Sequence, residues 1–129
     1  MSDNFSSGSA ESLLKVGLVG TGYAAKLRAE TLQKDQRTDL VAVVGHTVDK
    51  TAEFSRTYQA EAIASVAELV RSDVDLVIVA SVNREHGAIA RTALENSKHV
   101  VVEYPLSLDI QEAEAVSYTH LTLPTRVAV

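Results

Sequence analysis

The segment Lys15–Ala25 (KVGLVGTGYAA) constrains the fold more than any other part of the sequence. A short apolar run leads into closely spaced glycines and then into a helical pattern, which is typical of a buried parallel strand joined to a helix. Gly20, Gly22 and Ala25 form the motif G-x-G-x-x-A. Its first glycine makes a tight turn, its second lets a pyrophosphate approach the backbone, and its alanine lets helix and strand pack closely. The phosphates would lie on the free N–H groups at the helix start. The alternative is a glycine turn that only joins two packed elements.

Composition argues against several kinds of partner. The chain has 129 residues, enough for one domain with a core, and its apolar content of 46% is ordinary for a globular protein. A net charge of -5 argues against nucleic acid, and the absence of a long apolar run argues against a membrane span. The chain has no cysteine, and its four histidines show no metal-ligand spacing, so we expect no metal site. Residues 1–12 lack signal-peptide features, and we expect a disordered leader on a cytoplasmic protein.

Short apolar runs alternate with helical patterns along the chain. We expect strands at Leu14–Val19, Leu40–Val44, Asp75–Ala80 and His99–Glu103, and a short one at Ala62-Ile63. Helices are expected from Gly22 to about Lys34, from Val48 to Tyr58, from Ser65 to about Arg71 and over Glu85–Asn96, with Ser65 and Glu68 as a capping box. This alternation predicts an α/β fold of the Rossmann type, a doubly wound parallel sheet with strand order 3-2-1-4. In such a sheet the ligand binds outside the carboxyl ends of the strands.

The end of the second strand bears on the choice of cofactor. A site that prefers NAD usually has Asp or Glu there, about twenty residues past the glycines, to bind the ribose 2′-OH. This chain has Gly45, His46 and Thr47 instead, and Asp49 lies further on as a helix-start acid. Without a carboxylate, nothing repels a 2′-phosphate, and His46, Thr47 and Lys50 can donate to one. We therefore expect NADP(H) in preference to NAD(H). The alternative is a neutral turn that discriminates poorly.

Two polar residues follow the third main strand. Asn83 comes just after the strand, and His86 lies in the first turn of the next helix. In this position they would place polar groups beside the nicotinamide and its ribose. In the alternative, which spacing alone favours, Asn83 is a helix N-cap and His86 is an ordinary first-turn residue.

Four segments together carry a family resemblance. They are Val16–Ala25, Asp75–Ala80, the pair Asn83 and His86, and Lys98–Leu106 (KHVVVEYPL). With them, the stretch from Leu14 to Ala115 resembles the nucleotide-binding domain of the Gfo/Idh/MocA oxidoreductases. Most of that family carries Glu-Lys-Pro, with a lysine taken as catalytic, where this chain has Glu103-Tyr104-Pro105. The Glu-Tyr-Pro-Leu sequence and the neutral turn after the second strand resemble the biliverdin reductase branch of the family, particularly its cyanobacterial type.

The resemblance implies a small-molecule substrate, namely the tetrapyrrole biliverdin, reduced by NADPH to bilirubin. Tyr104 would line a pyrrole face or donate a hydrogen bond, and we interpret it as a positioning group because a phenol is a poor acid at neutral pH. Its alternative role is a tyrosine packed beside Pro105. Two other functions stay open: a sugar or cyclitol dehydrogenase of the same family, and a nucleotide-binding module without catalysis. A homo-oligomer would form through a second domain.

The expected cofactor contacts lie at four strand ends. They are Gly20, Thr21, Gly22, Tyr23, Ala24 and Ala25 after the first strand; Gly45, His46 and Thr47 after the second; Ala80, Ser81, Val82, Asn83 and His86 after the third; and Glu103 and Tyr104 after the fourth.

The last fourteen residues depart from this pattern. No charged residue occurs from Val116 to Thr125, and the helix that begins near Asp109 is expected to stop without a cap near Ala115. Residues 116–125 resemble a translated sequencing adapter, and we exclude 116–129 from fold and function as a non-native tail. The nucleotide-binding domain is then 13–115, with its sheet incomplete at one edge. The alternative is a genuine divergent tail.

Overall fold

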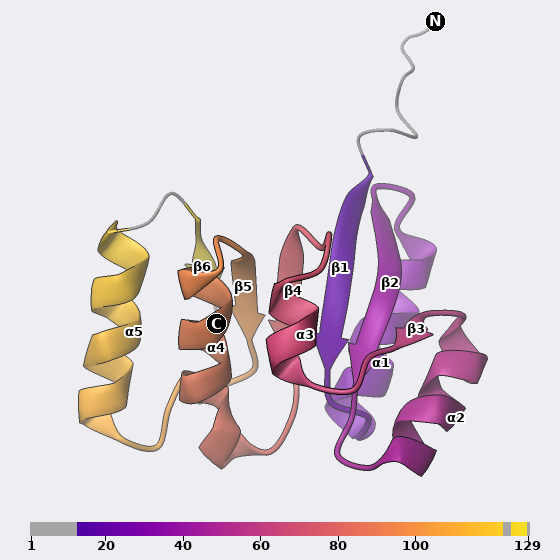
Figure 1. Cartoon of the computed structure of the whole chain (residues 1–129), viewed down its shortest axis with the longest axis horizontal. Coiled ribbons are helices and arrows are strands. Elements are labelled where there is room, and N and C mark those ends of the chain that lie inside the picture. The colour runs from indigo at the N-terminus through magenta and orange to yellow at the C-terminus, as the bar shows by residue number, and fades with distance from the viewer. Residues whose placement is uncertain (1–12, 123–124, 129) are drawn as a thin grey trace, which may run out of the picture.

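A parallel sheet organises the computed structural model, which describes residues 13–122 and 125–128. Its strands are β1 (Leu14–Val19), β2 (Thr38–Val44), β3 (Glu61–Ala62), β4 (Leu76–Val79), β5 (His99–Val102) and β6 (Val127–Ala128). They lie in the order β3-β2-β1-β4-β5-β6, and every pair of neighbours is parallel (Figure 1). The predicted order 3-2-1-4 is confirmed, with the short β3 counted third. From β1 the chain adds β2 and β3 on one side and then β4, β5 and β6 on the other. The strand order thus reverses between β1 and β4, where α/β proteins of this kind bind their ligands.

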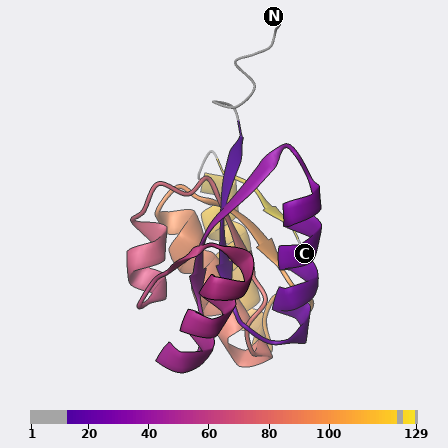
Figure 2. The ribbon, with the colours of Figure 1, turned by 90° about the vertical axis from the view of Figure 1, so that its right-hand side faces the viewer.

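Helices cover both faces of this sheet. They are α1 (Tyr23–Lys34), α2 (Val48–Tyr58), α3 (Val66–Val70), α4 (His86–Glu95) and α5 (Ile110–Thr122), with a short 3₁₀-helix η2 (Asn83–Glu85) before α4. Seen along the sheet, α1 lies on one side of the strands and α3 on the other (Figure 2). The fold is therefore the expected doubly wound, Rossmann-type α/β fold. None of the described helices is long and apolar enough to span a bilayer.

Successive side chains of the central strands point to opposite faces of the sheet, and each face has its own hydrophobic core. On β4, Val77 and Val79 pack into the core shared with α3 and α4, whereas Ile78 packs into the core shared with α1 and α2. On β1, Val16 and Leu18 also face α1 and α2. Because successive side chains point to opposite faces, a strand buried on both faces is apolar throughout. This is why the apolar runs predicted the strands well.

Local side-chain bonds begin two of the helices. The Thr47 hydroxyl accepts a hydrogen bond from the Lys50 N–H at the start of α2. The Ser65 hydroxyl accepts one from the Glu68 N–H at the start of α3, which confirms Ser65 as an N-cap. Such bonds satisfy backbone donors that the first turn of a helix leaves free.

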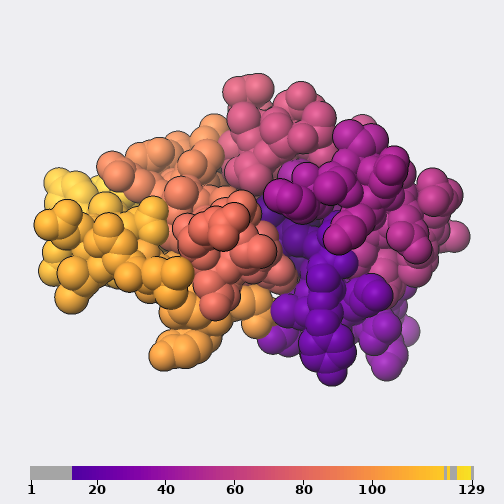
Figure 3. Space-filling model, turned by 90° about the horizontal axis from the view of Figure 1, so that it is seen from below, coloured from indigo at the N-terminus to yellow at the C-terminus, as the bar shows by residue number. Residues whose placement is uncertain are grey.

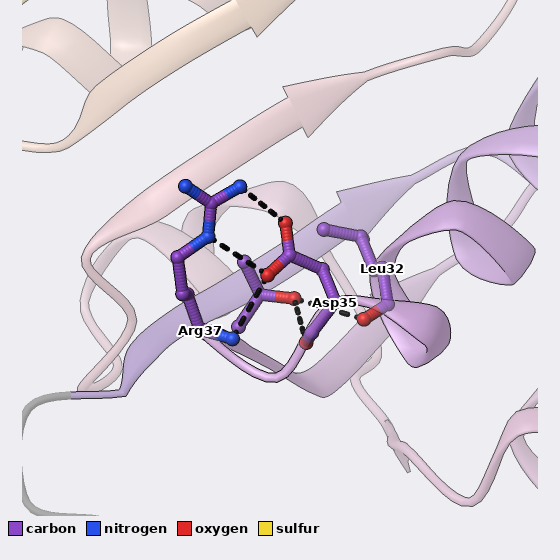
Figure 4. Close-up of polar contacts among 4 residues, drawn as sticks. Leu32, Asp35 and Arg37 are labelled. Carbon is purple, nitrogen blue, oxygen red and sulfur yellow. Dashed lines mark hydrogen bonds and ion pairs between the residues drawn. The ribbon is translucent and has the colours of Figure 1, made fainter. Parts of the chain in front are cut away.

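The turn between α1 and β2 lies at the amino edge of the sheet, opposite the expected ligand edge. The Asp35 carboxylate accepts hydrogen bonds from the Arg37 guanidinium at 2.8 and 3.0 Å and from the Arg37 N–H at 2.9 Å (Figure 4). The Thr38 hydroxyl bonds to the Leu32 carbonyl oxygen at 2.9 Å. Hydrogen bonds from Arg37 stabilise the charged carboxylate and lower the pKa of Asp35 to about 2.

The structure corrects the expected end of the last helix. Helix α5 does not stop near Ala115 but continues to Thr122, and Val116 is fully buried in the core on the α4 side. The chain then adds β6 beside β5, where the Val100 N–H donates to the Arg126 carbonyl oxygen at 2.8 Å. The sheet edge beyond β5 thus carries a two-residue strand instead of lying open. The apolar character of Val116 explains the continuation, because its burial against α4 favours a longer helix.

Candidate functional site

The turn from β1 to α1 brings three strand ends together. Gly20 has φ +122°, a conformation that side chains with a Cβ rarely adopt, and an added Cβ would lie 2.4 Å from the Ala80 carbonyl oxygen. The Gly20 N–H donates to the Val44 carbonyl oxygen at 2.8 Å. The turn therefore contacts the end of β2 on one side and the end of β4 on the other. This matches the predicted role of Gly20 as the tight-turn glycine.

The start of α1 is open and lacks a side-chain cap. Gly22 is its N-cap, the described residues supply no side-chain hydrogen bond there, and the first turn holds no acidic residue. A Cβ added to Gly22 would have no heavy atom of the described residues within 4 Å. Packing within the chain thus does not explain the glycine, whereas the approach of a ligand does. Free N–H groups and the helix dipole favour an anion at this point. Ala25 is fully buried under the turn, as the motif predicts.

A cavity of about 430 Å³ opens at the carboxyl edge beside this turn. Figure 3 looks onto that edge, where the indigo atoms of the β1–α1 turn lie beside the salmon atoms of the β4–α4 segment. The cavity is lined by Val19, Gly20, Thr21, Gly22, Tyr23, Ala24, Val44, Gly45, His46, Val66, Ala80, Ser81, Val82, Glu85 and Ile89. The structure thus brings together expected contacts from three strand ends. Sequence reasoning missed Val66, which begins α3, and Glu85 and Ile89, which lie at the end of η2 and in the first turn of α4.

The hydroxyl of Ser81 is a buried polar group on the wall of this cavity. Among the residues that the structure describes, it has no hydrogen-bond partner. A buried hydroxyl without a partner is costly, and such a group is usually paired. A polar ligand in the cavity would supply that partner. With the uncapped start of α1, the residues present therefore fit a dinucleotide: the helix N–H groups would hold its pyrophosphate, and Ser81 would bond to one of its polar atoms.

The end of β2 presents no carboxylate to the cavity. Gly45 is closely packed, because an added Cβ would lie 2.5 Å from the Thr51 hydroxyl oxygen and 2.6 Å from the Thr21 methyl. His46 lines the cavity, whereas the hydroxyl of Thr47 is engaged in capping α2. Lys50 lines a neighbouring hollow that also includes Thr21.

The end of β5 is tied to α1 by an ion pair. The Arg28 guanidinium donates to both carboxylate oxygens of Glu103, through Nε and, at 3.0 Å, through Nη2. The hydrogen bond from Arg28, with the charges of Arg28 and His86, lowers the pKa of Glu103 below its ordinary value. The carboxylate is thus occupied by Arg28. The next residue, Tyr104, is 85% exposed. Both roles expected for it, a positioning group and a tyrosine packed beside Pro105, stay predictions.

In the β4–α4 segment, the structure confirms His86 as a first-turn residue of α4 and corrects the N-cap expected at Asn83. His86 is 1% exposed, and its ring nitrogens face backbone carbonyl oxygens, so the ring is turned away from the cavity. Asn83 does not cap α4 but begins η2, and α4 starts after Glu85. Helix α4 thus begins one residue after the expected Glu85, and the short η2 precedes it. Asn83, Thr47, Glu103 and Tyr104 lie outside the cavity lining, and cofactor contacts for them stay predictions.

A glycine turn, an uncapped helix start and a cavity at the switch point define the nucleotide-binding domain of a Rossmann-fold dehydrogenase. Residues 14–129 match the family model described as "Oxidoreductase family, NAD-binding Rossmann fold" (GFO_IDH_MocA). The chain therefore belongs to the Gfo/Idh/MocA oxidoreductase family.

Three relatives illustrate the range of this family. Biliverdin reductase from Synechocystis sp. PCC 6803, solved with biliverdin and NADP+, is 38% identical with a TM-score of 0.86, covering 90% of this chain and 37% of that one. GenD2 from gentamicin A biosynthesis, solved with NAD, is 27% identical with a TM-score of 0.85, covering 90% and 34%. Glucose-6-phosphate 3-dehydrogenase from Bacillus subtilis is 30% identical over 115 residues, which are 89% of this chain and 33% of the relative. The chain thus spans about a third of the length of such relatives.

Proposed function

We propose that this chain is the nucleotide-binding domain of an NADPH-dependent reductase that converts biliverdin to bilirubin. The observation that carries the proposal is the Glu103-Tyr104-Pro105 segment, which presents an exposed tyrosine where most of the family has a lysine. The 38% identity to the Synechocystis biliverdin reductase supports the same substrate class. The segment follows β5 directly, at the edge of the sheet where the cavity opens.

The residues of this chain bind and orient in this proposal. The N–H groups at the start of α1 hold the pyrophosphate, and the Ser81 hydroxyl anchors the ligand on the β4 side. When bound, the nicotinamide supplies a hydride, and bilirubin forms when the bridge carbon gains that hydride and a pyrrole nitrogen gains a proton. Tyr104 lies against the tetrapyrrole and fixes its orientation, while Arg28 holds Glu103 in place beside it.

The test is a spectral assay of the protein encoded by the complete source gene. Biliverdin with NADPH should be consumed, whereas glucose 6-phosphate or an inositol with NADP+ should give no reduced cofactor. Tyr104→Phe should retain turnover within about tenfold, because a positioning group contributes less than a general acid, whose loss costs roughly a hundredfold or more. Turnover of the sugar substrates without turnover of biliverdin would refute the proposal.

A sugar or cyclitol dehydrogenase is the second candidate, and the 30% identity to glucose-6-phosphate 3-dehydrogenase favours it. The missing lysine at position 104 opposes it. A third candidate, a nucleotide-binding module without catalysis, predicts that NADPH binds while none of these substrates consumes it. The same assay therefore separates all three.

We also propose that the cofactor is NADP(H). The end of β2 offers His46 at the cavity and Lys50 nearby, and no carboxylate at Gly45–Thr47 repels a 2′-phosphate. The Synechocystis reductase holds NADP+, whereas GenD2 holds NAD. Lys50→Ala should weaken NADPH binding by about tenfold, which corresponds to one lost charged contact, and leave NADH binding unchanged. Lys34→Ala, at the far end of α1, is the matched control. Equal losses for both cofactors would contradict the assignment.

The proposed native domain is 13–115, and residues 116–129 are proposed to be translated adapter. The uncharged stretch from Val116 to Thr125 supports this. Sequencing the source DNA across the codon for Ala115 tests it. An open frame that continues with a different sequence is the expected result, and a genome that encodes 116–129 as printed would refute it.

A further inference from the structure

The His86 ring joins two loops at the ligand edge. His86 is the first residue of α4, and its side chain is almost fully buried. Its Nε2 lies 2.8 Å from the Ser81 carbonyl oxygen, just after β4. Its Nδ1 lies 2.8 Å from the Pro105 carbonyl oxygen, after β5. One buried side chain thus spans from the wall of the cavity to the segment that carries Tyr104.

Each of the two contacts requires a proton on the ring nitrogen that makes it. A carbonyl oxygen only accepts hydrogen bonds, and a neutral imidazole has a single N–H, whereas the imidazolium has two. Both contacts are therefore hydrogen bonds only when both ring nitrogens carry protons. Charged groups near the ring are the Glu103 carboxylate with its partner Arg28, the Glu112 carboxylate of α5 against Gly87, and Arg84 and Glu85 of η2.

The two loops that His86 joins have different tasks. Ser81 lines the cavity with a hydroxyl that has no partner among the residues described, and its backbone carbonyl oxygen faces Nε2 of His86. Pro105 follows the exposed Tyr104, whose other neighbour, Glu103, is held by Arg28. Both neighbours of Tyr104 are thus held in place: the Glu103 side chain by Arg28, and the Pro105 carbonyl by His86. Such bonds hold a binding group in place before its ligand arrives, so that less conformational entropy is lost on binding.

We propose that His86 is a positioning residue that fixes the ends of β4 and β5 to each other and so shapes the nicotinamide half of the dinucleotide site. The inference rests on the proposed NADPH function. In a fold of this type the adenosine ribose lies at the end of β2, so the other half of the dinucleotide extends over the ends of β4 and β5. Loss of the His86 link therefore weakens the hold on the nicotinamide half and leaves the adenine half bound as before.

Binding of NADPH and of 2′,5′-ADP, which carries only the adenine half, tests the proposal on the full 129-residue chain. His86→Gln can bond to one carbonyl at most, and we expect it to lower NADPH affinity about tenfold while 2′,5′-ADP affinity changes less than twofold. His99→Gln, at the amino edge of the sheet, is the matched control and should change neither. Equal losses for both ligands, or no loss for either, would overturn the positioning role. Failure of the wild type to bind either ligand would instead overturn the proposed function, and the inference with it.

A measurement on the wild type keeps the proposal testable if His86→Gln does not fold. Nuclear magnetic resonance of the chain labelled with ¹⁵N-histidine reports which ring nitrogens carry protons. We expect each His86 ring nitrogen to carry the proton that its carbonyl partner requires, at Ser81 and at Pro105. A single protonated nitrogen on His86 would show that one of the two links is absent and would overturn the proposal.

Discussion

Replacing Gly20 with alanine tests whether the β1–α1 turn is limited by backbone geometry. A non-glycine residue held at φ +122° costs roughly 1–3 kcal/mol. The new Cβ would also lie 2.4 Å from the Ala80 carbonyl oxygen, so the end of β4 must move, at an overpacking cost of roughly 1–3 kcal/mol. Gly20→Ala should therefore lower the free energy of unfolding by about 2–6 kcal/mol. Domains of this size are stable by only about 5–15 kcal/mol.

Gly22→Ala is the matched control for this change. The same methyl group meets no described atom within 4 Å at Gly22, so only the change of N-cap residue affects stability, by about 1 kcal/mol or less. The methyl would, however, lie where the pyrophosphate approaches the helix start. NADPH affinity should fall about tenfold or more, which corresponds to the loss of one hydrogen bond to a charged group.

Urea unfolding followed by circular dichroism gives the stability of the two variants, and titration with NADPH gives their affinity. We expect opposite results from the two variants: a loss of stability for Gly20→Ala, and a loss of binding with stability retained for Gly22→Ala. Two variants with equal stability would refute the argument on backbone geometry. Unchanged NADPH affinity in Gly22→Ala would refute the argument that the second glycine makes room for a ligand.

Three further outcomes follow from the structure. Glu103→Gln should lower the free energy of unfolding by about 1 kcal/mol at neutral pH. Because Arg28 lowers the pKa of Glu103, the ion pair is lost as pH falls through that pKa, and the difference between the two proteins should vanish in acid. A difference that persists in acid would contradict the ion pair. The Asp35 carboxyl should titrate near pH 2 by nuclear magnetic resonance, so that its contribution to stability is complete above about pH 4 and is lost toward pH 2. In Arg37→Ala the pKa of Asp35 should rise toward its ordinary value, because the guanidinium is lost while the backbone N–H of residue 37 still donates. Leu69→Ala should lower the free energy of unfolding by about 2–5 kcal/mol in urea, because Leu69 is fully buried against Gly17; a loss below 1 kcal/mol would show that the core on the α3 side is loosely packed.

The expectations that were confirmed rest on short-range patterns. The bounds of β1 match, since a strand buried on both faces is apolar along its whole length. Ser65 caps α3 because its partner, the N–H of Glu68, is only three residues away. The tight turn at Gly20 is equally local, because the glycine spacing itself requires a particular backbone path. In each case the interacting groups lie within one turn or one strand of each other.

The features that spacing did not predict depend on distant residues. His86 is a first-turn residue of α4, as its spacing indicates, but one partner of its buried ring, Pro105, lies nineteen residues further along the chain. The ion pair of Arg28 with Glu103 joins residues that are 75 positions apart, and no spacing rule predicts it. The end of α5 was misplaced because burial of Val116 against α4 outweighs the missing cap signal.

By itself the sequence determined the fold class, the position of the glycine turn and the edge of the sheet at which a ligand binds. These features follow from apolar periodicity and from glycine spacing, which act within a few residues. The tertiary structure decided which polar groups are free to meet that ligand. Within residues 13–122 and 125–128, it gives the Ser81 hydroxyl on the cavity wall no hydrogen-bond partner. It also pairs Glu103 with Arg28 and buries the ring of His86 between two carbonyl oxygens. Whether a polar group is free or paired depends on what the fold brings beside it, because hydrogen bonds reach only about 3 Å in space, whatever the distance along the chain.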